Sequence, residues 1–183
     1  MSDLVFALSF LFFLLVFAVL GSLALAGLSA APWVPLWKKD IRRMLKVADV
    51  KPGEIVYDLG AGDGRIIIIA AAEFGALATG FEFAFLPYFL AWAKIKLLGL
   101  SKKAKLKYGN FFRTDFSQAD VICTFLTPQA MAKLKPKFET NTKSGCRIVS
   151  YAFSIPGWQP KIIDKPNQKT TVVYLYQKEN QVK

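Results

Sequence analysis

Small residues and acids follow a strand-like run near the middle of the chain. From Val56 to Gly64 the sequence is VYDLGAGDG, and an apolar run from Arg65 to Phe74 comes directly after it. Glycine lets a ligand lie against the backbone, because it has no side chain to hold the ligand away. The pattern predicts a strand, a ligand-binding turn and a helix, with Asp58 and Asp63 beside the ligand.

Dinucleotides also bind to a glycine-rich turn after a strand, so they are the first alternative. In their fingerprint a third glycine falls three residues after the second, where it allows close packing of helix on strand, and Arg65 holds that position here. Asp63 also lies where the phosphates would meet the helix N-terminus, and its carboxylate would repel them. The turn therefore indicates a ligand without phosphate, and a cationic ligand suits the two acids.

A third acid follows the glycine-rich turn at the distance that a βαβ unit requires. Residues 76–82 predict a strand that ends in Glu82. An acid at this strand tip accepts hydrogen bonds from both hydroxyl groups of a ribose. We therefore expect a ligand that contains a nucleoside.

Taken in order, these pieces resemble the S-adenosylmethionine site of class I methyltransferases. That cofactor carries a sulfonium, an ammonium and one carboxylate, but no phosphate. In the same class a polar residue after the third strand meets the adenine amino group, and Asn110 matches it, with Phe111 beside the base. The resemblance implies a Rossmann-like α/β sheet with helices on both faces. It assigns the following residues to the cofactor: Asp58, Gly60, Ala61, Gly62, Asp63, Glu82, Phe83, Asn110 and Phe111.

An uncharged apolar run from Leu4 to Leu28 precedes this domain. At about 1.5 Å per residue it is long enough to cross a hydrocarbon core of about 30 Å. A cleaved signal peptide is the alternative, because residues 24–26 (Ala-Leu-Ala) have the small-x-small form of a cleavage site. However, no basic residue precedes the run, and it exceeds the usual apolar region of about 7–15 residues. We expect a transmembrane anchor within residues 1–31.

Charge predicts how this anchor is oriented. Asp3 is the only charge before the span, whereas four basic residues, Lys38, Lys39, Arg42 and Arg43, follow it closely. The positive-inside rule then predicts a single-pass protein of the cell membrane whose C-terminal domain faces the cytoplasm. That domain contains all 24 Lys and Arg and 12 of the 13 acids, a net charge of 24 − 12 = +12. The charge suits an anionic leaflet or an acidic partner, and with an anchor present we do not expect nucleic acid.

Cysteine and histidine usage narrows the chemistry. Cys123 and Cys146 are the only cysteines, have no paired spacing and lie in apolar runs, so we expect free buried thiols in a reducing compartment. Histidine is absent, which removes the commonest general base and any site with histidine metal ligands. We expect no metal.

The remaining sequence predicts one α/β domain after a short connection. Residues 32–35 (Pro-Trp-Val-Pro) predict a stiff connector with its aromatic at the membrane interface, and residues 36–50 a helix with one basic face. Residues 51–183 then form the methyltransferase domain. Besides the elements above, we expect strands at 105–111, 119–126, 146–151 and 170–176, and helices at 83–98 and 130–139.

Residues 83–98 are apolar on nearly every side of the expected helix, with Lys94 and Lys96 near its end. Two interpretations remain open. The segment is either a core helix packed on the sheet or an interfacial helix partly immersed in the bilayer. A second span is excluded because the uncharged stretch is too short.

Several segments resemble the family of small membrane-anchored relatives of ATP synthase c-subunit lysine N-methyltransferase. They are the connector at 32–35, the loop at 57–66, the residues around strand four at 116–118 and 128–131, and Pro156-Gly157-Trp158-Gln159-Pro160. The resemblance implies methylation of a lysine on a membrane-associated protein by in-line transfer to a neutral amine. It implies an acceptor-side wall made of Thr127, Pro128, Gln129, Tyr151 and Trp158, where aromatic faces hold a methylammonium.

Two alternatives to a protein lysine remain. Residues 126–129 read Leu-Thr-Pro-Gln where enzymes that methylate nucleobase or glutamine amides carry Asp/Asn-Pro-Pro-Tyr/Phe, which argues against those substrates. A phospholipid or another lipophilic amine at the membrane surface remains open because the segment 83–98 is so apolar. A non-catalytic scaffold is disfavoured, since the cofactor loop and Glu82 are intact.

Overall fold

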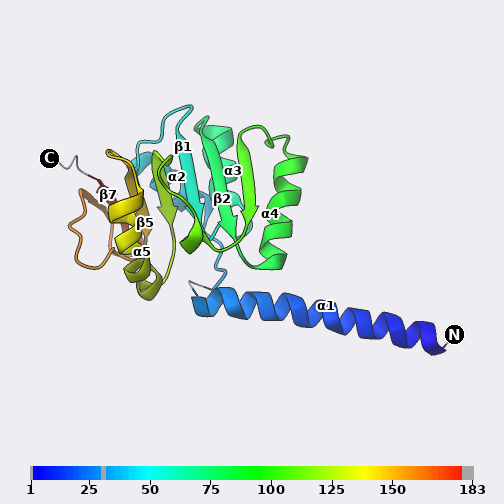
Figure 1. Ribbon diagram of the computed structural model, residues 1–183. Coiled ribbons are helices and arrows are strands. Elements are labelled where there is room, and N and C mark those ends of the chain that lie inside the picture. The colour runs from blue at the N-terminus through cyan, green and yellow to red at the C-terminus, as the bar shows by residue number, and fades with distance from the viewer. Residues whose placement is uncertain (1, 30–31, 179–183) are drawn as a thin grey trace.

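The computed structural model describes residues 2–29 and 32–178. It contains a seven-stranded mixed sheet with helices on both faces, preceded by one long N-terminal helix (Figure 1). This is the fold class that the glycine loop predicts. The expected boundary at residue 31 and the end of the domain at residue 183 lie outside the described residues.

The elements alternate as expected for a βαβ architecture. The helices are α1 (Ser2–Ser29), α2 (Lys38–Val47), α3 (Arg65–Glu73), α4 (Phe85–Leu97) and α5 (Pro128–Asn141), with a 3-10 turn η1 at Phe111–Arg113. The strands are β1 (Ile55–Leu59), β2 (Leu77–Glu82), β3 (Ala104–Tyr108), β4 (Val121–Thr124), β5 (Arg147–Tyr151), β6 (Ile162–Asp164) and β7 (Val173–Gln177).

The strand order is β3-β2-β1-β4-β5-β7-β6. The first five strands in this order are parallel, and β7 and then β6 add antiparallel to β5. The chain order reverses between β1 and β4, and ligands of open α/β sheets bind at the carboxyl ends of the strands beside such a reversal. The sheet topology therefore places a crevice beside the end of β1.

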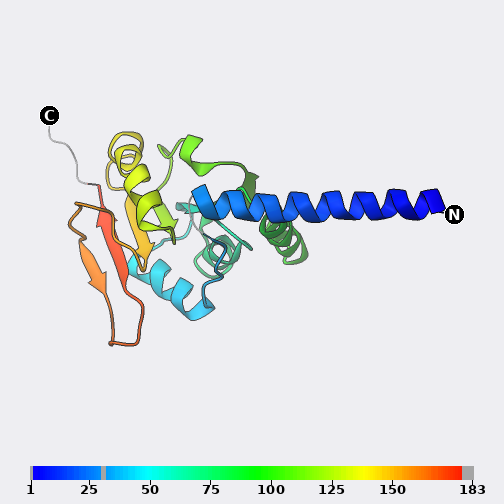
Figure 2. The ribbon, with the colours of Figure 1, turned by 90° about the horizontal axis from the view of Figure 1, so that it is seen from below.

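Two apolar cores lie on opposite faces of the sheet. Helices α2, α3 and α4 cover one face and α5 covers the other (Figure 2). Neighbouring residues of one strand contribute to opposite cores, as Val121 and Ile122 of β4 do, because side chains of a strand alternate in direction. Both cysteines, Cys123 and Cys146, are buried and unpaired.

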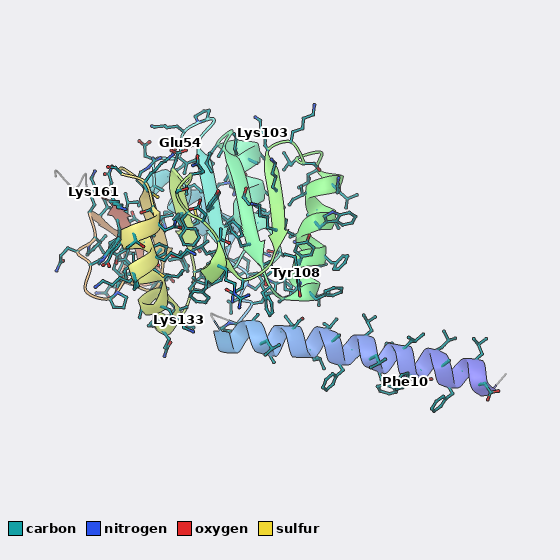
Figure 3. All side chains as sticks on the ribbon, viewed as in Figure 1. Phe10, Glu54, Lys103, Tyr108, Lys133 and Lys161 are labelled. Atoms are coloured by element: carbon teal, nitrogen blue, oxygen red, sulfur yellow. The ribbon has the colours of Figure 1, made fainter. Side chains whose placement is uncertain are left out.

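Helix α1 passes below the carboxyl edge of the sheet and projects beyond the domain (Figure 1). Figure 3 shows Phe10 pointing away from the domain, Tyr108 at the edge near α1, and Glu54 and Lys103 at the opposite edge. Within α1, the 25 residues Asp3–Gly27 are long and apolar enough to cross a membrane. The length alone does not separate a membrane span from a signal sequence.

Helix α4 has an unusual distribution of apolar residues. It packs on β2 and β3 through a narrow face of Pro87, Ala91 and Ile95. Its larger side chains point outward, and Phe89 and Trp92 are 47% and 49% exposed. The interpretation of residues 83–98 as an ordinary core helix is therefore wrong for most of the surface of this helix.

Most expected elements are confirmed within a few residues, and the differences have local causes. Helix α5 begins earlier than predicted, at Pro128, because the Thr127 hydroxyl accepts a hydrogen bond from Ala130 N at 3.3 Å and caps it. The third expected strand ends earlier, at Tyr108, since η1 follows. Strand β6 was not predicted, because it is only three residues long and depends on pairing with β7.

The loop after β1 packs very closely on β2. Gly60 N and Ala61 N both donate to Phe81 O, at 3.0 and 2.9 Å. A Cβ built on Gly80 would lie 2.6 Å from Ala61 Cβ and 3.0 Å from Ile67 Cδ1. Gly80 is therefore required by the approach of the loop rather than by its own backbone conformation.

Gly80→Ala is expected to lower the free energy of unfolding by about 1–3 kcal/mol, because the added methyl group overpacks the contact with Ala61. Chemical denaturation in detergent micelles measures this change. The double variant Ala61→Gly/Gly80→Ala removes the obstructing Cβ and should recover a large part of the loss. Equal instability of the single and double variants would contradict the assigned contact.

Candidate functional site

A cavity of about 290 Å³ opens at the carboxyl edge of the sheet, beside the ends of β1, β2 and β4. This volume lies near the lower end of the range of ligand sites. All nine residues predicted to bind the cofactor line it: Asp58, Gly60, Ala61, Gly62, Asp63, Glu82, Phe83, Asn110 and Phe111. The structure thus brings together side chains that lie far apart in the chain. Their role in binding stays a prediction.

The glycine loop exposes backbone to this cavity. Gly60 and Gly62 have φ angles of +82° and +54°, a region that side chains other than glycine rarely adopt. A Cβ on Gly60 would lie 3.3 Å from Leu126 Cδ2, and one on Gly62 would lie 2.8 Å from the ring of Trp33. The absence of side chains at these positions therefore lets Leu126 and Trp33 pack close against the loop.

Glu82 connects the loop to the start of α4. Its Oε2 accepts a hydrogen bond from Gly62 N at 2.7 Å, and its Oε1 accepts from Phe83 N at 2.9 Å and from Ala84 N at 2.6 Å. Each carboxylate oxygen has two lone pairs, so Oε1 is saturated and Oε2 keeps one. In this arrangement Glu82 offers one acceptor position to a ribose, whereas the sequence predicted two.

Asp58 is a buried acid with one oxygen that has no partner among the described residues. It is 2% exposed, and the oxygen in question is Oδ2. Burial, and then the charges of Glu82 and Asp63, raise the pKa of Asp58 to about 8. A cationic group bound in the cavity would supply the missing partner and stabilise the carboxylate. This orphaned oxygen fits S-adenosylmethionine, which carries an ammonium and a sulfonium.

Asp63 is different, because its charge is balanced within the protein. It accepts hydrogen bonds from Arg65 at 2.8 and 2.7 Å and from Lys94 at 2.6 Å. Burial acts to raise the pKa of Asp63, but the hydrogen bonds from Arg65 and Lys94 outweigh it and the pKa is lowered. The sequence treated both acids as partners of a cation, and the structure leaves Asp58 as the one whose charge is uncompensated.

Asn110 has a structural task besides its predicted contact with adenine. Its Oδ1 accepts a hydrogen bond from Phe112 N at 2.9 Å and so caps η1. The cap orients Phe111, which is buried, and Phe112, whose ring lies 4.7 Å from that of Phe111. Both rings line the cavity.

The N-terminal segment forms a wall of the cavity that the sequence did not predict. Trp33 lies over Gly62 and lines the cavity, whereas its expected place at a membrane interface stays a prediction. Arg65 donates to Leu36 O and thereby ties the connector to the loop. The signal available in the sequence was a tryptophan between two prolines immediately before the domain, which fixes a rigid aromatic close to it.

The five residues predicted for the acceptor side are not gathered in one place. Thr127, Pro128 and Gln129 directly follow Leu126, which lines the cavity. Tyr151 is buried behind the cavity and packs edge-on against Phe125, a lining residue, at 5.1 Å between ring centroids. Trp158 lies along α5, where it donates to Glu139 at 3.1 Å and packs on Tyr176. The lining residues missing from the prediction on this side are Trp33, Phe112 and Phe125.

Several known methyltransferases resemble this chain in sequence or in fold. The profile of the ANTKMT methyltransferase domain matches residues 58–162. A protein-lysine N-methyltransferase of Saccharolobus islandicus is 44% identical over 148 residues, which is 79% of this chain and 92% of that protein. The human ATP synthase c-subunit lysine N-methyltransferase is 32% identical over 70% of this chain, but the chain spans only 54% of its length.

Among solved structures, an RNA methyltransferase from Salinibacter ruber in complex with S-adenosyl-L-homocysteine superposes with a TM-score of 0.77. The two sequences are 31% identical, and the match covers 82% of this chain and 97% of the chain in that structure. The match therefore includes nearly the whole of a protein that was crystallised with the product form of the cofactor.

Asp58→Asn is expected to raise the free energy of unfolding at neutral pH in the absence of ligand. The pKa of Asp58 is about 8 in the folded protein against an ordinary value of 3.8, so between these pH values the folded state holds a proton that the unfolded chain has released. Wild-type stability therefore falls as pH rises through this window, and the variant lacks the loss. The gain is near zero at about pH 4 and on the order of a few kcal/mol at about pH 7.

Chemical denaturation of both proteins from about pH 4 to about pH 9 measures this difference. Asp115→Asn is the control, because Asp115 lies outside the cavity and its pKa is lowered by hydrogen bonds, first from Ser117 N. It should leave the pH dependence above about pH 5 unchanged. A wild-type slope that persists in Asp58→Asn would show that another group titrates.

Proposed function

The chain belongs to the family of the ANTKMT methyltransferase domain and is an S-adenosylmethionine-dependent class I methyltransferase, and from this premise we propose that it methylates a lysine of a membrane-associated protein. The observation that carries the lysine assignment is the 44% identity to a protein-lysine N-methyltransferase over 92% of that relative's length. The cavity with its unpaired Asp58 supports the cofactor half of the proposal.

When bound, S-adenosylmethionine would supply a methyl group on a positively charged sulfur. A neutral lysine amine would take this methyl group in line as the carbon–sulfur bond breaks and S-adenosylhomocysteine leaves. The chain's own residues have to orient the two reactants and keep water out. Asp58 attracts the cationic end of the cofactor, the glycine loop gives backbone contact along it, and Glu82 and Asn110 bind its nucleoside. The positions of these residues around the cavity support the proposed roles.

The acceptor lysine enters on the side where the cavity is aromatic. Trp33, Phe112 and Phe125 line it there, and Tyr151 supports Phe125 from behind. Aromatic faces suit the aliphatic stem of a lysine and attract its methylated ammonium by cation-π contact. Thr127, Pro128 and Gln129 form the adjoining rim in this proposal. Trp158 contributes at most indirectly, through its packing along α5.

The membrane part of the proposal rests on α1. Its residues Asp3–Gly27 have the length and hydropathy of a membrane span, and the large apolar side chains of its N-terminal half are exposed in the structure. Two relatives are named for membrane proteins as substrates, the ATP synthase c-subunit and the adenine nucleotide translocase. We place residues 1–31 in the cell membrane as a single anchor, residues 32–50 as connector and residues 51–183 as the catalytic domain in the cytoplasm.

RNA is the second candidate acceptor, and one observation favours it. One solved structure, which covers 82% of the chain, is described as an RNA methyltransferase, and the net charge of +11 is compatible with a polyanion. The cavity walls favour an acceptor that reaches the site along a membrane instead, because residues of α1 and of the connector line the cavity.

The binding role of Asp58 predicts that Asp58→Asn weakens the affinity for S-adenosylmethionine by about 10- to 100-fold, since a charge-assisted contact contributes about 1.5–3 kcal/mol. Isothermal titration of the detergent-solubilised protein at about pH 8.5 measures it. Wild-type affinity should rise between about pH 6.5 and 8.5 as Asp58 ionises, and the variant should show no such rise. Asp115→Asn should bind as the wild type does. Unchanged affinity in Asp58→Asn would refute the assignment.

The acceptor class is tested with methyl-labelled cofactor and membranes that contain the protein. Protein, lipid and RNA fractions are separated, and the protein fraction is hydrolysed to identify methylated lysine. We expect label in lysine, and at least about tenfold less label with the Asp58→Asn variant when the cofactor concentration is below its dissociation constant. Label only in lipid identifies a lipophilic amine as the acceptor, and label only in RNA identifies a nucleic acid; either result overturns the lysine proposal.

A further inference from the structure

The outward surface of α4 is apolar, although the rest of the domain surface is strongly charged. We call this surface the α4 outer face; it consists of Phe85, Leu86, Phe89, Leu90, Trp92 and Leu97, all between 39% and 87% exposed. The opposite, buried side of the helix carries smaller side chains, mainly Pro87 and Ala91. A contiguous exposed patch of this kind marks an interaction surface.

A contact between α1 and α4 sets the depth of this surface relative to a membrane. Phe85 N, at the start of α4, donates to Ser22 Oγ of α1 at 3.2 Å. The helix from Asp3 to Gly21, about 28 Å long, lies beyond this contact. That length matches a hydrocarbon core of about 30 Å. A spanning α1 therefore puts the first turn of α4 at the boundary between acyl chains and headgroups.

The direction of α4 agrees with this depth. Helix α4 lies across α1 rather than along it, at the side of the domain from which α1 projects (Figures 1 and 2). A helix that lies across a spanning helix runs parallel to the membrane plane. Its outer face then points towards the bilayer, as in an interfacial amphipathic helix.

Charge around the α4 outer face fits an anionic lipid surface. The segment from Phe83 to Thr114 contains no Asp or Glu. Lysines are exposed at the end of α4 and along the neighbouring edge of the sheet: Lys96, Lys102, Lys103, Lys105 and Lys107. Each basic residue near an anionic leaflet contributes about 1 kcal/mol of attraction.

We propose that the α4 outer face is inserted in the cytoplasmic interface of the bilayer, so that α1 and α4 together hold the domain against the membrane. The proposal rests on the proposed span of α1. The catalytic cavity is lined by Leu23 and Ala26 of α1 and by Phe83 and Ala84 just before α4, so it opens between the two membrane contacts. The acceptor is therefore an amine in the headgroup layer, such as that of a lysine at the end of a membrane-embedded segment.

Single cysteines in the full chain test the insertion. Cys123 and Cys146 are fully buried, so a fluorophore reacts selectively with an added cysteine. Phe89→Cys places it on the α4 outer face. Ile163→Cys is the matched control, an exposed apolar residue of β6, and Leu11→Cys marks the middle of α1. The proteins are reconstituted in vesicles of phosphatidylcholine and phosphatidylglycerol, and quenching by nitroxide lipids is compared with quenching by aqueous iodide.

We expect the label at residue 89 to be quenched by lipids with a nitroxide near the headgroup at least about threefold more than the label at 163, with the opposite order for iodide. Equal iodide quenching at 89 and 163, with residue 11 still protected, overturns the insertion of α4 and leaves the anchor intact. Iodide quenching at residue 11 overturns the proposed anchor itself.

Activity gives an independent measurement. Phe89→Glu/Leu90→Glu should reduce methylation of the membrane acceptor about tenfold while S-adenosylmethionine binding is unchanged, because both residues are exposed and lie outside the cavity. Ile163→Glu should have no effect on either quantity. Wild-type activity of the double variant in membranes would contradict a role of this surface in catalysis at the interface.

Discussion

The close approach of the glycine loop to the end of β2 is the constraint on which the site depends. Two backbone N–H groups of the loop share Phe81 O, and a third, from Gly62, is bound by Glu82. No side chain fits at Gly80, because Ala61 occupies that space. The same contacts join the glycine loop to the end of β2 and to the start of α4, and the crevice between the ends of β1 and β4 stays open for a ligand.

Electrostatics give the crevice its preference for a cation. Three acids meet there, and they differ in how far neighbouring groups satisfy them. Asp63 is paired with Arg65 and Lys94, and Glu82 is held by backbone N–H groups, whereas Asp58 keeps a buried oxygen without a partner among the described residues. Burying that group lowers the stability of the ligand-free protein, which is the usual relation between a prepared binding site and stability. This loss of stability arises at Asp58 Oδ2, in a residue that lines the cavity.

The N-terminal segment forms part of the wall of the cavity. The end of α1 and the connector are walls of the cavity rather than a flexible tether, since Trp33 lies over Gly62 and Arg65 binds Leu36 O. A change in the position of α1 therefore changes the shape of the acceptor side. In the proposed membrane setting, this arrangement favours acceptors that reach the cavity along the membrane surface.

The sequence by itself determined the fold class, the family and the residues around the cofactor cavity, because strand, glycine turn and acidic strand tip are local patterns with fixed spacing. Only the tertiary structure decided that Asp63 is neutralised, since Lys94 reaches it from another helix. It also decided that Trp33 covers the loop, that Trp158 lies away from the cavity, and that the apolar residues of α4 face outward. Such facts depend on which elements pack together, and no periodicity within a single element contains that information.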